Sequence, residues 1–282
     1  MIRNALTVDV EDYFHVSAFA GTISRSDWGE HALRVENNTR RLLDLFEERK
    51  VRATFFILGW VAERIPNLVR EIATRGHEIA SHGYSHQLVY SQAPEVFREE
   101  TLRSKALLED IIQTTVHGYR AASYSITERS RWALDIIAEA GFTYDSSIFP
   151  VRHDRYGMPG TAVYPYRLLT PAGHSLVEFP LSTATVLGCR LPIAGGGYFR
   201  LYPYLVTKLG LSQINRKGQP FIFYLHPWEI DPDQPRVAAG WVSRFRHYNN
   251  LDKCESRLQS LMRDFKLCAA IDVLNDLEMF TE

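Results

Sequence analysis

The fold of this chain is constrained most by a repeated alternation of short β-rich runs with longer stretches of helical periodicity. Seven runs rich in β-branched and aromatic residues cover residues 5–10, 53–58, 77–80, 117–120, 142–144, 176–179 and 221–225. Between them, apolar residues recur at helical spacing, as at 37–50, 94–115 and 129–140. Strands that alternate with amphipathic helices typically form a parallel sheet covered by those helices. The pattern therefore predicts an α/β fold, and seven strands suit an incomplete barrel.

Two regions interrupt this alternation. Residues 151–173 are rich in Pro, Gly and Tyr and show no period, which predicts a long insertion or a substrate loop. The glycine run from Gly195 to Gly197 predicts a similar loop, since it is not followed by the residues of a phosphate-binding loop.

The C-terminal tail reads as an appended element. From residue 250 it has helical spacing, and an apolar patch at 267–273 fits either a last strand or a last helix. We therefore expect a single domain over residues 1–282, with a core at about 4–228 and a helical extension at about 229–282.

Composition limits the classes of function. A chain of 282 residues buries enough surface to hold a core without a disulfide or a metal, so any metal would serve chemistry. With 32 basic and 33 acidic residues the net charge is −1, which does not favour a nucleic acid partner. The three cysteines are widely spaced, which argues against a disulfide framework or a zinc knuckle. No window approaches the ~18 apolar residues of a membrane span, and no signal peptide is evident, so we expect a cytoplasmic protein.

Polar side chains gather where the predicted strands end. In a barrel of parallel strands these ends meet on one face, which is where such folds build active sites. The residues concerned are Asp9, Glu11, Asp12, Ser81, His82, His86, Arg120, Asp145, Ser146, Ser182, Thr183, His226, Trp228 and Glu229.

A metal site is predicted from two of these segments. His82 and His86 are spaced to share one face of a helical turn, although an isolated pair of this kind is more often found on the surface. Glu11 or Asp12 supplies a third ligand, and two histidines with one carboxylate leave a coordination position open for water. Asp9 lies within an apolar strand, where an acid costs free energy unless it is paired or functional, so it is a candidate general base.

Five motifs in order carry a family resemblance. They are TVDVED, SHGYSH, GYRAASYS, YDSS and YLHP, and they resemble the motifs of the polysaccharide deacetylases, the NodB-homology group or carbohydrate esterase family four. The resemblance spans roughly residues 4–228 and implies a distorted, incomplete (β/α)7 barrel. The later segments GGGYFRLYPY, HPWEIDPDQPR and RFRHYNN resemble a bacterial subgroup associated with exosortase and exopolysaccharide loci.

The resemblance implies roles for the matching residues. Asp9 corresponds to the catalytic base, Arg120 to the arginine that pairs with it, and His226 to the general acid. His82 and His86 correspond to the metal histidines. Asp145 corresponds to the acidic residue of the fourth motif, which in the family helps to set the charge and orientation of the arginine or histidine.

The first motif departs from the family pattern. Val10 follows Asp9 where the family has a second aspartate, so the metal carboxylate is Glu11 or Asp12. Alternation along the strand places Asp9 and Glu11 on the same side, which favours Glu11 slightly.

The fourth motif lacks its usual tryptophan, which leaves the wall of the acetyl pocket to Trp228 or Tyr124. The family mechanism implies that water activated by the ion attacks the acetamide carbonyl while Asp9 takes its proton and His226 protonates the leaving amine. A backbone N–H near Tyr124 would hold the oxyanion.

The implied cofactor is a divalent transition metal, zinc being the first choice. The implied partner is an N-acetylated oligo- or polysaccharide, or its lipid-linked precursor, met during exopolysaccharide biosynthesis at the inner face of the membrane. Assembly into a homo-oligomer is left open. Arg244, Arg246 and His247 either tie the tail to the barrel or bind an anionic or lipid-phosphate part of the substrate.

Two alternatives belong to other classes. The barrel could be a non-catalytic carbohydrate-binding subunit, or a hydrolase of other non-peptide C–N bonds such as those of cyclic amides. A metal assay distinguishes them from a deacetylase, since some relatives with other substrates lack the metal histidines.

Overall fold

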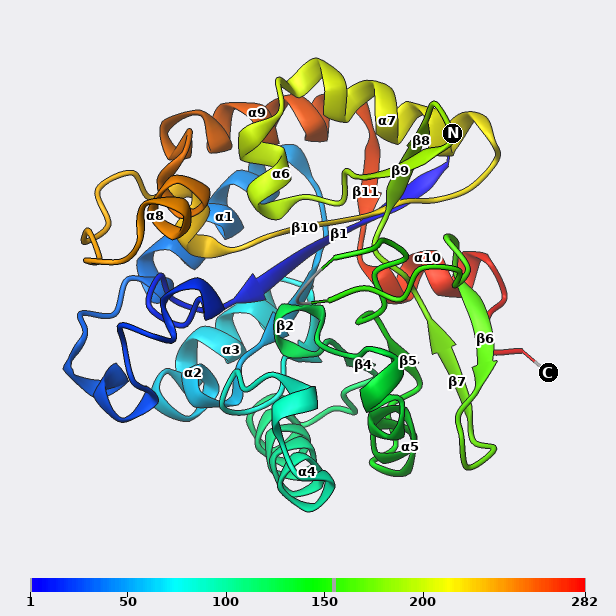
Figure 1. Ribbon diagram of the computed structural model, residues 1–282, viewed down its shortest axis with the longest axis horizontal. Helices are drawn as coiled ribbons and strands as arrows, with labels where there is room; N and C mark the ends of the chain where they lie inside the picture. The colour runs from blue at the N-terminus through cyan, green and yellow to red at the C-terminus, as the bar shows by residue number, and fades with distance from the viewer. Residues whose placement is uncertain (1, 154–155, 282) are drawn as a thin grey trace.

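The fold of the protein is a barrel wall of parallel strands wrapped by helices (Figure 1). The computed structural model describes residues 2–153 and 156–281. Seven parallel strands lie side by side in the order β10-β1-β2-β3-β4-β5-β7. Their bounds are β1 (Arg3–Val10), β2 (Thr54–Ile57), β3 (Glu78–Ser81), β4 (Gly118–Tyr119), β5 (Tyr144–Asp145), β7 (Ser175–Glu178) and β10 (Ile222–Leu225). The predicted α/β fold and its seven strands are confirmed.

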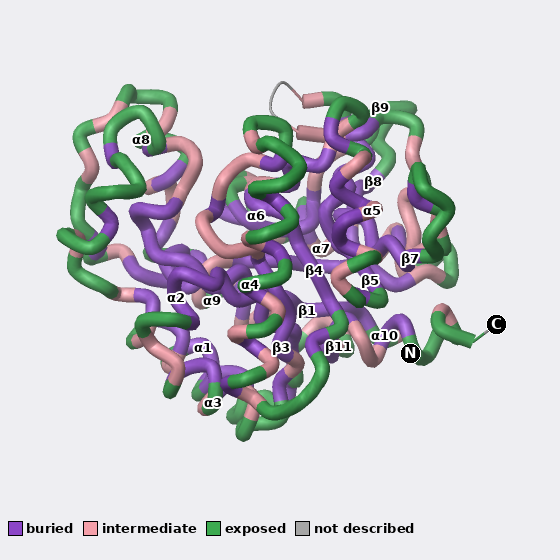
Figure 2. The backbone as a smooth tube through the Cα atoms, turned by 90° about the horizontal axis from the view of Figure 1, so that it is seen from below, coloured by how far each residue is buried: buried purple, intermediate pink, exposed green. Residues whose placement is uncertain are grey.

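Helices connect successive strands and cover the outside of the sheet. Those between the strands are α1 (Val35–Arg49), α2 (Gly59–Arg64), α3 (Pro66–Thr74), α4 (Pro94–Ile112), α5 (Trp132–Glu139), α6 (Gly196–Leu201) and α7 (Tyr204–Arg216). Proline occupies the first turn of α3 and α4, where its missing N–H is not needed. Figure 2 shows the strands buried in the middle of the molecule and the helices exposed on their outer faces.

The two regions predicted as loops contain regular structure. Strand β6 (Tyr166–Leu169) lies within the predicted insertion and pairs antiparallel with β7, while residues 154 and 155 of that insertion lie outside the described residues. Strands β8 (Thr183–Val186) and β9 (Cys189–Pro192) form a separate hairpin. The glycine run leads into α6. Residue 195 must be glycine, because its φ is +131° and a Cβ there would come within 1.8 Å of the Tyr224 carbonyl oxygen.

The C-terminal tail contributes to the barrel itself. Its elements are α8 (Trp241–Tyr248), α9 (Leu251–Asp264), β11 (Lys266–Cys268) and α10 (Ala270–Asp276). The sequence predicts either a strand or a helix for the apolar patch at 267–273, and the structure has both, a short strand followed by the start of a helix. Strand β11 pairs in parallel with the first residues of β1, so the tail extends the main sheet.

The carboxyl ends of the strands define the functional face. Strand β1 is buried along its whole length after Arg3, so its last residues reach this face from the centre of the barrel. In Figure 1 the arrowhead of β1 points to the side of the molecule where α8 lies. Among the described residues, no helix is both long enough and apolar enough to cross a membrane.

Candidate active site

A buried ion pair joins Asp9 to Arg120 at the ends of β1 and β4. Nη1 of Arg120 donates to Asp9 Oδ1 at 2.6 Å and to Thr7 Oγ1 at 2.7 Å. The other guanidinium nitrogens donate to the carbonyl and the hydroxyl of Ser146 at 3.2 and 3.0 Å. A fully buried guanidinium is stable only when it is paired and hydrogen-bonded in this way. The ion pair occupies Oδ1 of Asp9 and leaves Oδ2 facing the site.

Glu11, His82 and His86 form a buried cluster that suits a metal ion. One ligand atom of each lies within 4.8 Å of the others. Nδ1 of His82 lies 2.9 Å from the Arg120 carbonyl oxygen, to which it can only donate, so Nε2 keeps its lone pair for an ion. Glu11 Oε2 lies 2.8 Å from His86 Nε2. Burial by itself raises the pKa of Glu11, but His86 and His226 lower it overall, so the carboxylate is charged.

The donor set fits a divalent transition ion. Two imidazole nitrogens and one carboxylate oxygen are the ligands of open catalytic zinc sites and also suit other first-row metals. Among the described residues, His86 Nδ1 is buried without a hydrogen-bond partner, and Glu11 Oε2 has His86 Nε2 as its one close polar neighbour. A bound cation would satisfy the carboxylate oxygen directly.

The two histidines lie on a loop, which corrects the predicted helical turn. Residues 82–86 follow β3 without helical structure, since Gly83 has φ of +71° and His86 φ of +51°. These left-handed conformations are incompatible with a regular helix. The Gly83 carbonyl oxygen accepts from Gly59 N at 2.8 Å, which ties the loop to the start of α2.

Asp12 lies outside the metal cluster and caps a helix. Its Oδ2 accepts from the backbone N–H groups of Arg34 and Val35 at 2.7 and 2.8 Å, and its Oδ1 accepts from Tyr13 N at 2.9 Å. The amides of Arg34 and Val35 lie at the start of α1, where the residue before the helix provides no capping side chain. Of the two acids left open by the sequence, the structure therefore places Glu11 beside the histidines.

His226 faces the cluster from the end of β10 and is held by a second ion pair. Its Nδ1 lies 2.7 Å from Glu229 Oε1, and the other oxygen of Glu229 accepts from Arg200 Nε at 2.5 Å. Burial lowers the pKa of His226, but the hydrogen bond to Glu229 and the charge of Glu11 raise it overall to about 9. His226 Nε2 lies 3.9 Å from Asp9 Oδ2 and 3.5 Å from Glu11 Oε1. The imidazolium thus presents its Nε2 proton to the site.

The sequence predicts Glu229 on the active face without giving it a role, and it does not identify Arg200. Glu229 follows His226 by three residues, and its carboxylate also accepts from the His226 backbone N–H at 3.1 Å. This capping-box spacing is visible in the sequence HPWE and was the available signal. Arg200 lies in α6, far away in sequence, and only the fold brings it to Glu229.

Asp145 does not serve the site as expected. Its Oδ1 accepts from Ser147 Oγ at 2.6 Å, and its carboxyl lies against that of Glu178, with which it is paired across β5 and β7. Among the described residues, the hydrogen bonds of the Arg120 side chain go to Thr7, Asp9 and Ser146. The fourth motif therefore reaches the arginine through Ser146, and Glu229 is the carboxylate that orients the histidine.

The predicted roles of Tyr124 and Trp228 also change. The backbone N–H of Tyr124 donates to the Ala121 carbonyl at 3.1 Å, so it is not free for an oxyanion, while its hydroxyl lies 3.4 Å from Asp9 Oδ2. The Trp228 ring is covered on one face by His226 and on the other by His247, at centroid distances of 5.1 and 4.2 Å. Trp228 therefore braces the acid and cannot stack on a sugar.

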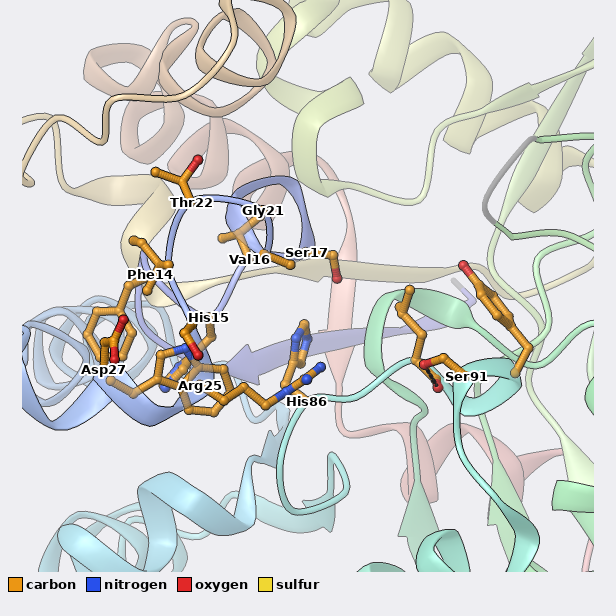
Figure 3. Close-up of a pocket in the computed structure, with 16 residues that line it drawn as sticks. Phe14, His15, Val16, Ser17, Gly21, Thr22, Arg25, Asp27, His86 and Ser91 are labelled. Carbon is orange, nitrogen blue, oxygen red and sulfur yellow. Dashed lines mark hydrogen bonds between the residues drawn. The ribbon is translucent and has the colours of Figure 1, made fainter.

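A hollow opens beside the metal cluster. It has a volume of about 460 Å³ and is lined by the segment after β1 and by the loop after His86. Figure 3 shows His15, Ser17 and His86 around it. This hollow gives a ligand of sugar size access to His86.

The comparisons with known proteins bear on this geometry. Residues 27–144 match the family model described as polysaccharide deacetylase. The N-terminal half resembles the polysaccharide deacetylases. Residues 146–275 match a model described as a domain of unknown function (DUF3473). His82, His86 and Arg120 fall in the first matched region, and His226 and Glu229 fall in the second.

Curated relatives agree with the deacetylase match. A peptidoglycan-N-acetylglucosamine deacetylase of Bacillus cereus is 27% identical over 182 residues, which are 58% of this chain and 63% of that protein. A chitooligosaccharide deacetylase of Rhizobium leguminosarum is 30% identical over 124 residues, which are 36% of this chain and 58% of that protein. The chain thus spans less than two thirds of these relatives.

Solved structures share the fold. A Mycobacterium smegmatis protein described as a candidate polysaccharide deacetylase aligns with a TM-score of 0.66 and 19% identity, over 99% of this chain and 90% of that chain. An allantoinase aligns with a TM-score of 0.61 and 15% identity, over 99% of this chain and 90% of that chain. At these identities the likeness shows the fold alone, which confirms the NodB-type barrel.

Proposed function

We propose that the protein is a metal-dependent hydrolase that removes N-acetyl groups from amino sugars. The observation that carries this proposal is the approach of Asp9 Oδ2 to His226 Nε2, at 3.9 Å, beside the cluster of Glu11, His82 and His86. A base and an acid beside a potential ion are what amide hydrolysis requires. The matched deacetylase family and its curated relatives support the same chemistry.

Glu11, His82 and His86 would hold the ion. When bound, a divalent cation of this kind supplies a Lewis acid that polarises a carbonyl and makes water more acidic. The rest of the chemistry belongs to the protein's own side chains.

Asp9 acts as the general base through Oδ2, because Arg120 holds Oδ1 and fixes the orientation of the carboxylate. Its Oδ2 takes the proton of the attacking water. The Tyr124 hydroxyl, 3.4 Å away, borders the same oxygen.

His226 acts as the general acid through Nε2. The hydrogen bond from Nδ1 to Glu229 keeps the ring charged, and Nε2 donates a proton to the nitrogen that leaves as an amine. The products are acetate and a free amino sugar.

The substrate is a polysaccharide or its lipid-linked precursor in exopolysaccharide biosynthesis, and zinc is the proposed ion. The hollow beside His86 suits a polar sugar, because hydroxyl groups, aromatic rings and the charged side chains of Arg25 and Asp27 line it. Curated relatives named for peptidoglycan and chitooligosaccharide support the N-acetylglucosamine class. A cytoplasmic location is part of this proposal.

The test is acetate release from N-acetylglucosamine oligomers by the purified protein, with bound metal measured on the same sample. Asp9→Asn and His226→Ala are expected to lower the rate by about 10²–10⁴-fold while keeping the metal. His82→Ala is expected to lose both metal and activity.

Each outcome has a meaning. Metal binding without acetate release from any N-acetylated sugar would contradict the proposal and favour a carbohydrate-binding role. Activity that survives in Asp9→Asn and in His82→Ala would exclude the proposed mechanism. Hydrolysis of cyclic amides in place of N-acetyl sugars would favour the other C–N hydrolase.

A further inference from the structure

The outer face of α8 exposes large apolar side chains beside the candidate active site. Trp241 is 78% exposed, Phe245 52% and Val242 43%. Their spacing along the helix places all three on the outward side, while His247 on the inward side is buried. A cluster of this kind on a soluble protein marks an interaction site. We refer to Trp241, Val242, Arg244 and Phe245 as the α8 face.

Arginines border this apolar stripe on both sides. Arg244 and Arg246 are exposed and flank Trp241, Val242 and Phe245 on the helix surface. Arg236, in the segment before α8, lies over the Tyr248 ring at 4.3 Å. None of the three arginines forms an ion pair with a residue that the structure describes, and residues 232–248 carry a single acid, Asp233.

A shallow depression runs along this surface. It has a volume of about 380 Å³, and its lining consists of Arg236, Trp241, Arg244, Phe245 and Tyr248. Two guanidinium groups and three aromatic rings around one depression suit an anionic group that sits at the edge of an apolar phase.

The inward side of α8 is fixed to the catalytic machinery. His247 stacks on Trp228, which in turn stacks on His226. Arg200 donates to the backbone carbonyls of Arg246, His247 and Asn249 as well as to Glu229. The α8 face therefore stands roughly one helix diameter, about 10 Å, beyond the rings that support the acid. Figure 2 shows α8 in an exposed lobe at one side of the molecule.

We propose that the α8 face binds the surface of an anionic lipid bilayer. Interfacial helices place Trp and Phe at the centre of the apolar side and arginines at its borders, where the aliphatic stems lie along the acyl boundary and the charged heads reach the lipid phosphates. A second copy of the chain is a poorer occupant, because a twofold contact through this face would bring the arginines of both copies together.

Binding to a bilayer would also indicate the class of substrate. This step rests on the proposed function: an enzyme held on the membrane by α8 keeps its acid close to the lipid surface, where amino sugars carried on a lipid phosphate are concentrated. The α8 face thus selects lipid-linked precursors over free polymer.

The test is co-sedimentation of the full chain with vesicles of phosphatidylcholine alone and with vesicles that also contain phosphatidylglycerol. Binding is expected only to the anionic vesicles. The double variant Trp241→Ser/Phe245→Ser is expected to weaken binding by at least about tenfold. Arg244→Gln is expected to weaken it by about fivefold, since one basic residue near an anionic surface contributes that much.

Matched controls test whether a loss of vesicle binding is specific to the α8 face or follows from the loss of any exposed side chain. Leu169→Ser removes a side chain that is 72% exposed on β6, at the opposite side of Figure 1, and Arg49→Gln removes an exposed arginine at the end of α1. Neither control is expected to change vesicle binding. Circular dichroism checks that every variant is folded.

Four results would overturn the proposal. They are absence of binding to anionic vesicles, equal binding to both vesicle types, binding that the α8 variants leave unchanged, and a dimer in solution that the α8 variants dissociate while vesicles stay unbound. Acetate release from a soluble oligomer is measured separately and is expected to be unchanged in the α8 variants. Vesicle binding without any deacetylation would contradict the proposed function and leave the membrane surface standing.

Discussion

At the scale of single residues, the site depends on two buried arginines that each hold one reacting group. Arg120 fixes Asp9, and Arg200 fixes Glu229, which in turn fixes His226. The hydrogen bond to Glu229 favours the charged imidazolium of His226, and the ion pair with Arg120 fixes the orientation of the Asp9 carboxyl group. Both groups are thus positioned before any substrate binds.

Replacing Glu229 is expected to move the pH dependence of the reaction. The pKa of His226 is about 9, and its protonated form donates the proton, so the rate should fall as pH rises through that range. Glu229→Gln removes the charge that raises this pKa, so the alkaline limb of the rate profile should move to lower pH, and the rate at pH 8 should fall by about tenfold or more.

The measurement is the pH profile of acetate release, with Glu229→Asp as the matched control that keeps the charge. Glu229→Asp should keep the limb near its original pH. An unchanged profile in Glu229→Gln would show that Glu229 serves only as a helix cap.

The sequence predicts the reacting residues better than their supports. Asp9 is identifiable because an acid in an apolar strand stands out from the local pattern, and the role of His226 follows from the family resemblance. The pairing of Glu229 with Arg200 is missed, because a buried charge pair depends on contacts between α6 and the segment after β10. The misplaced role of Asp145 has the same origin, since its neighbour Glu178 is set by the pairing of β5 with β7.

At the scale of elements, the alternating sequence pattern predicts the parallel strands of the barrel but not the short strands β6, β8 and β9. The seven parallel strands lie within two residues of the predicted bounds, because buried strands are continuous apolar runs. Strands β6, β8 and β9 are four residues each and partly exposed, so they lack a readable period. The histidine pair lies on a loop because the local backbone adopts positive φ, which residue spacing does not reveal.

Glu11 and Asp12 should separate metal binding from helix capping. Glu11→Gln is expected to lose bound metal with little change in the free energy of unfolding of the metal-free protein. Asp12→Ala is expected to keep the metal and to lower that free energy by about 1–2 kcal/mol, because two amides of α1 lose their acceptor.

Metal content by mass spectrometry and urea unfolding of metal-free samples check both variants. Loss of metal in Asp12→Ala, with retention in Glu11→Gln, would reverse the assignment of the carboxylate ligand.

The carboxyl pair of Asp145 and Glu178 should make stability depend on pH. Burial raises the pKa of Asp145 to about 6 and that of Glu178 well above its usual range. The folded protein therefore holds a proton that the unfolded chain releases above about pH 4, and stability falls as pH rises through these raised values.

In the Glu178→Gln variant, the side-chain amide can donate a hydrogen bond to the Asp145 carboxylate, so the pair no longer needs a bound proton. The variant is expected to raise the free energy of unfolding at pH 8 by about 1–3 kcal/mol relative to the unaltered protein, with the difference closing towards pH 4. Urea unfolding at a series of pH values tests this. A parallel shift at every pH would mean that the pair does not share a proton.

At the scale of the whole molecule, the C-terminal tail closes one end of the barrel. Strand β11 pairs with the start of β1, and α10 packs its buried residues Ala270, Val273 and Leu274 into the second apolar cluster of the core. The tail therefore contributes stability to the strands that carry the site, and its His247 also supports the site by stacking on Trp228.

Leu274→Ala is expected to lower the free energy of unfolding by about 2–5 kcal/mol, because it leaves a cavity at a fully buried position. Leu277→Ala, at a side chain that is 39% exposed, is the matched control and should cost less than about 1 kcal/mol. Urea unfolding measures both. Equal costs would show that α10 is only loosely attached to the barrel.

The two supporting arginines also bear on how such a protein can evolve. Asp9 and Arg120 come from the first half of the chain, whereas Arg200, Glu229 and His226 come from the second. A recombination event near residue 145 would inherit Asp9, Arg120 and the ion cluster from one parent and the acid with its two supports from the other. Selection would then act on the contacts that join the halves, where Asp9 meets His226 and where Arg120 donates to Ser146.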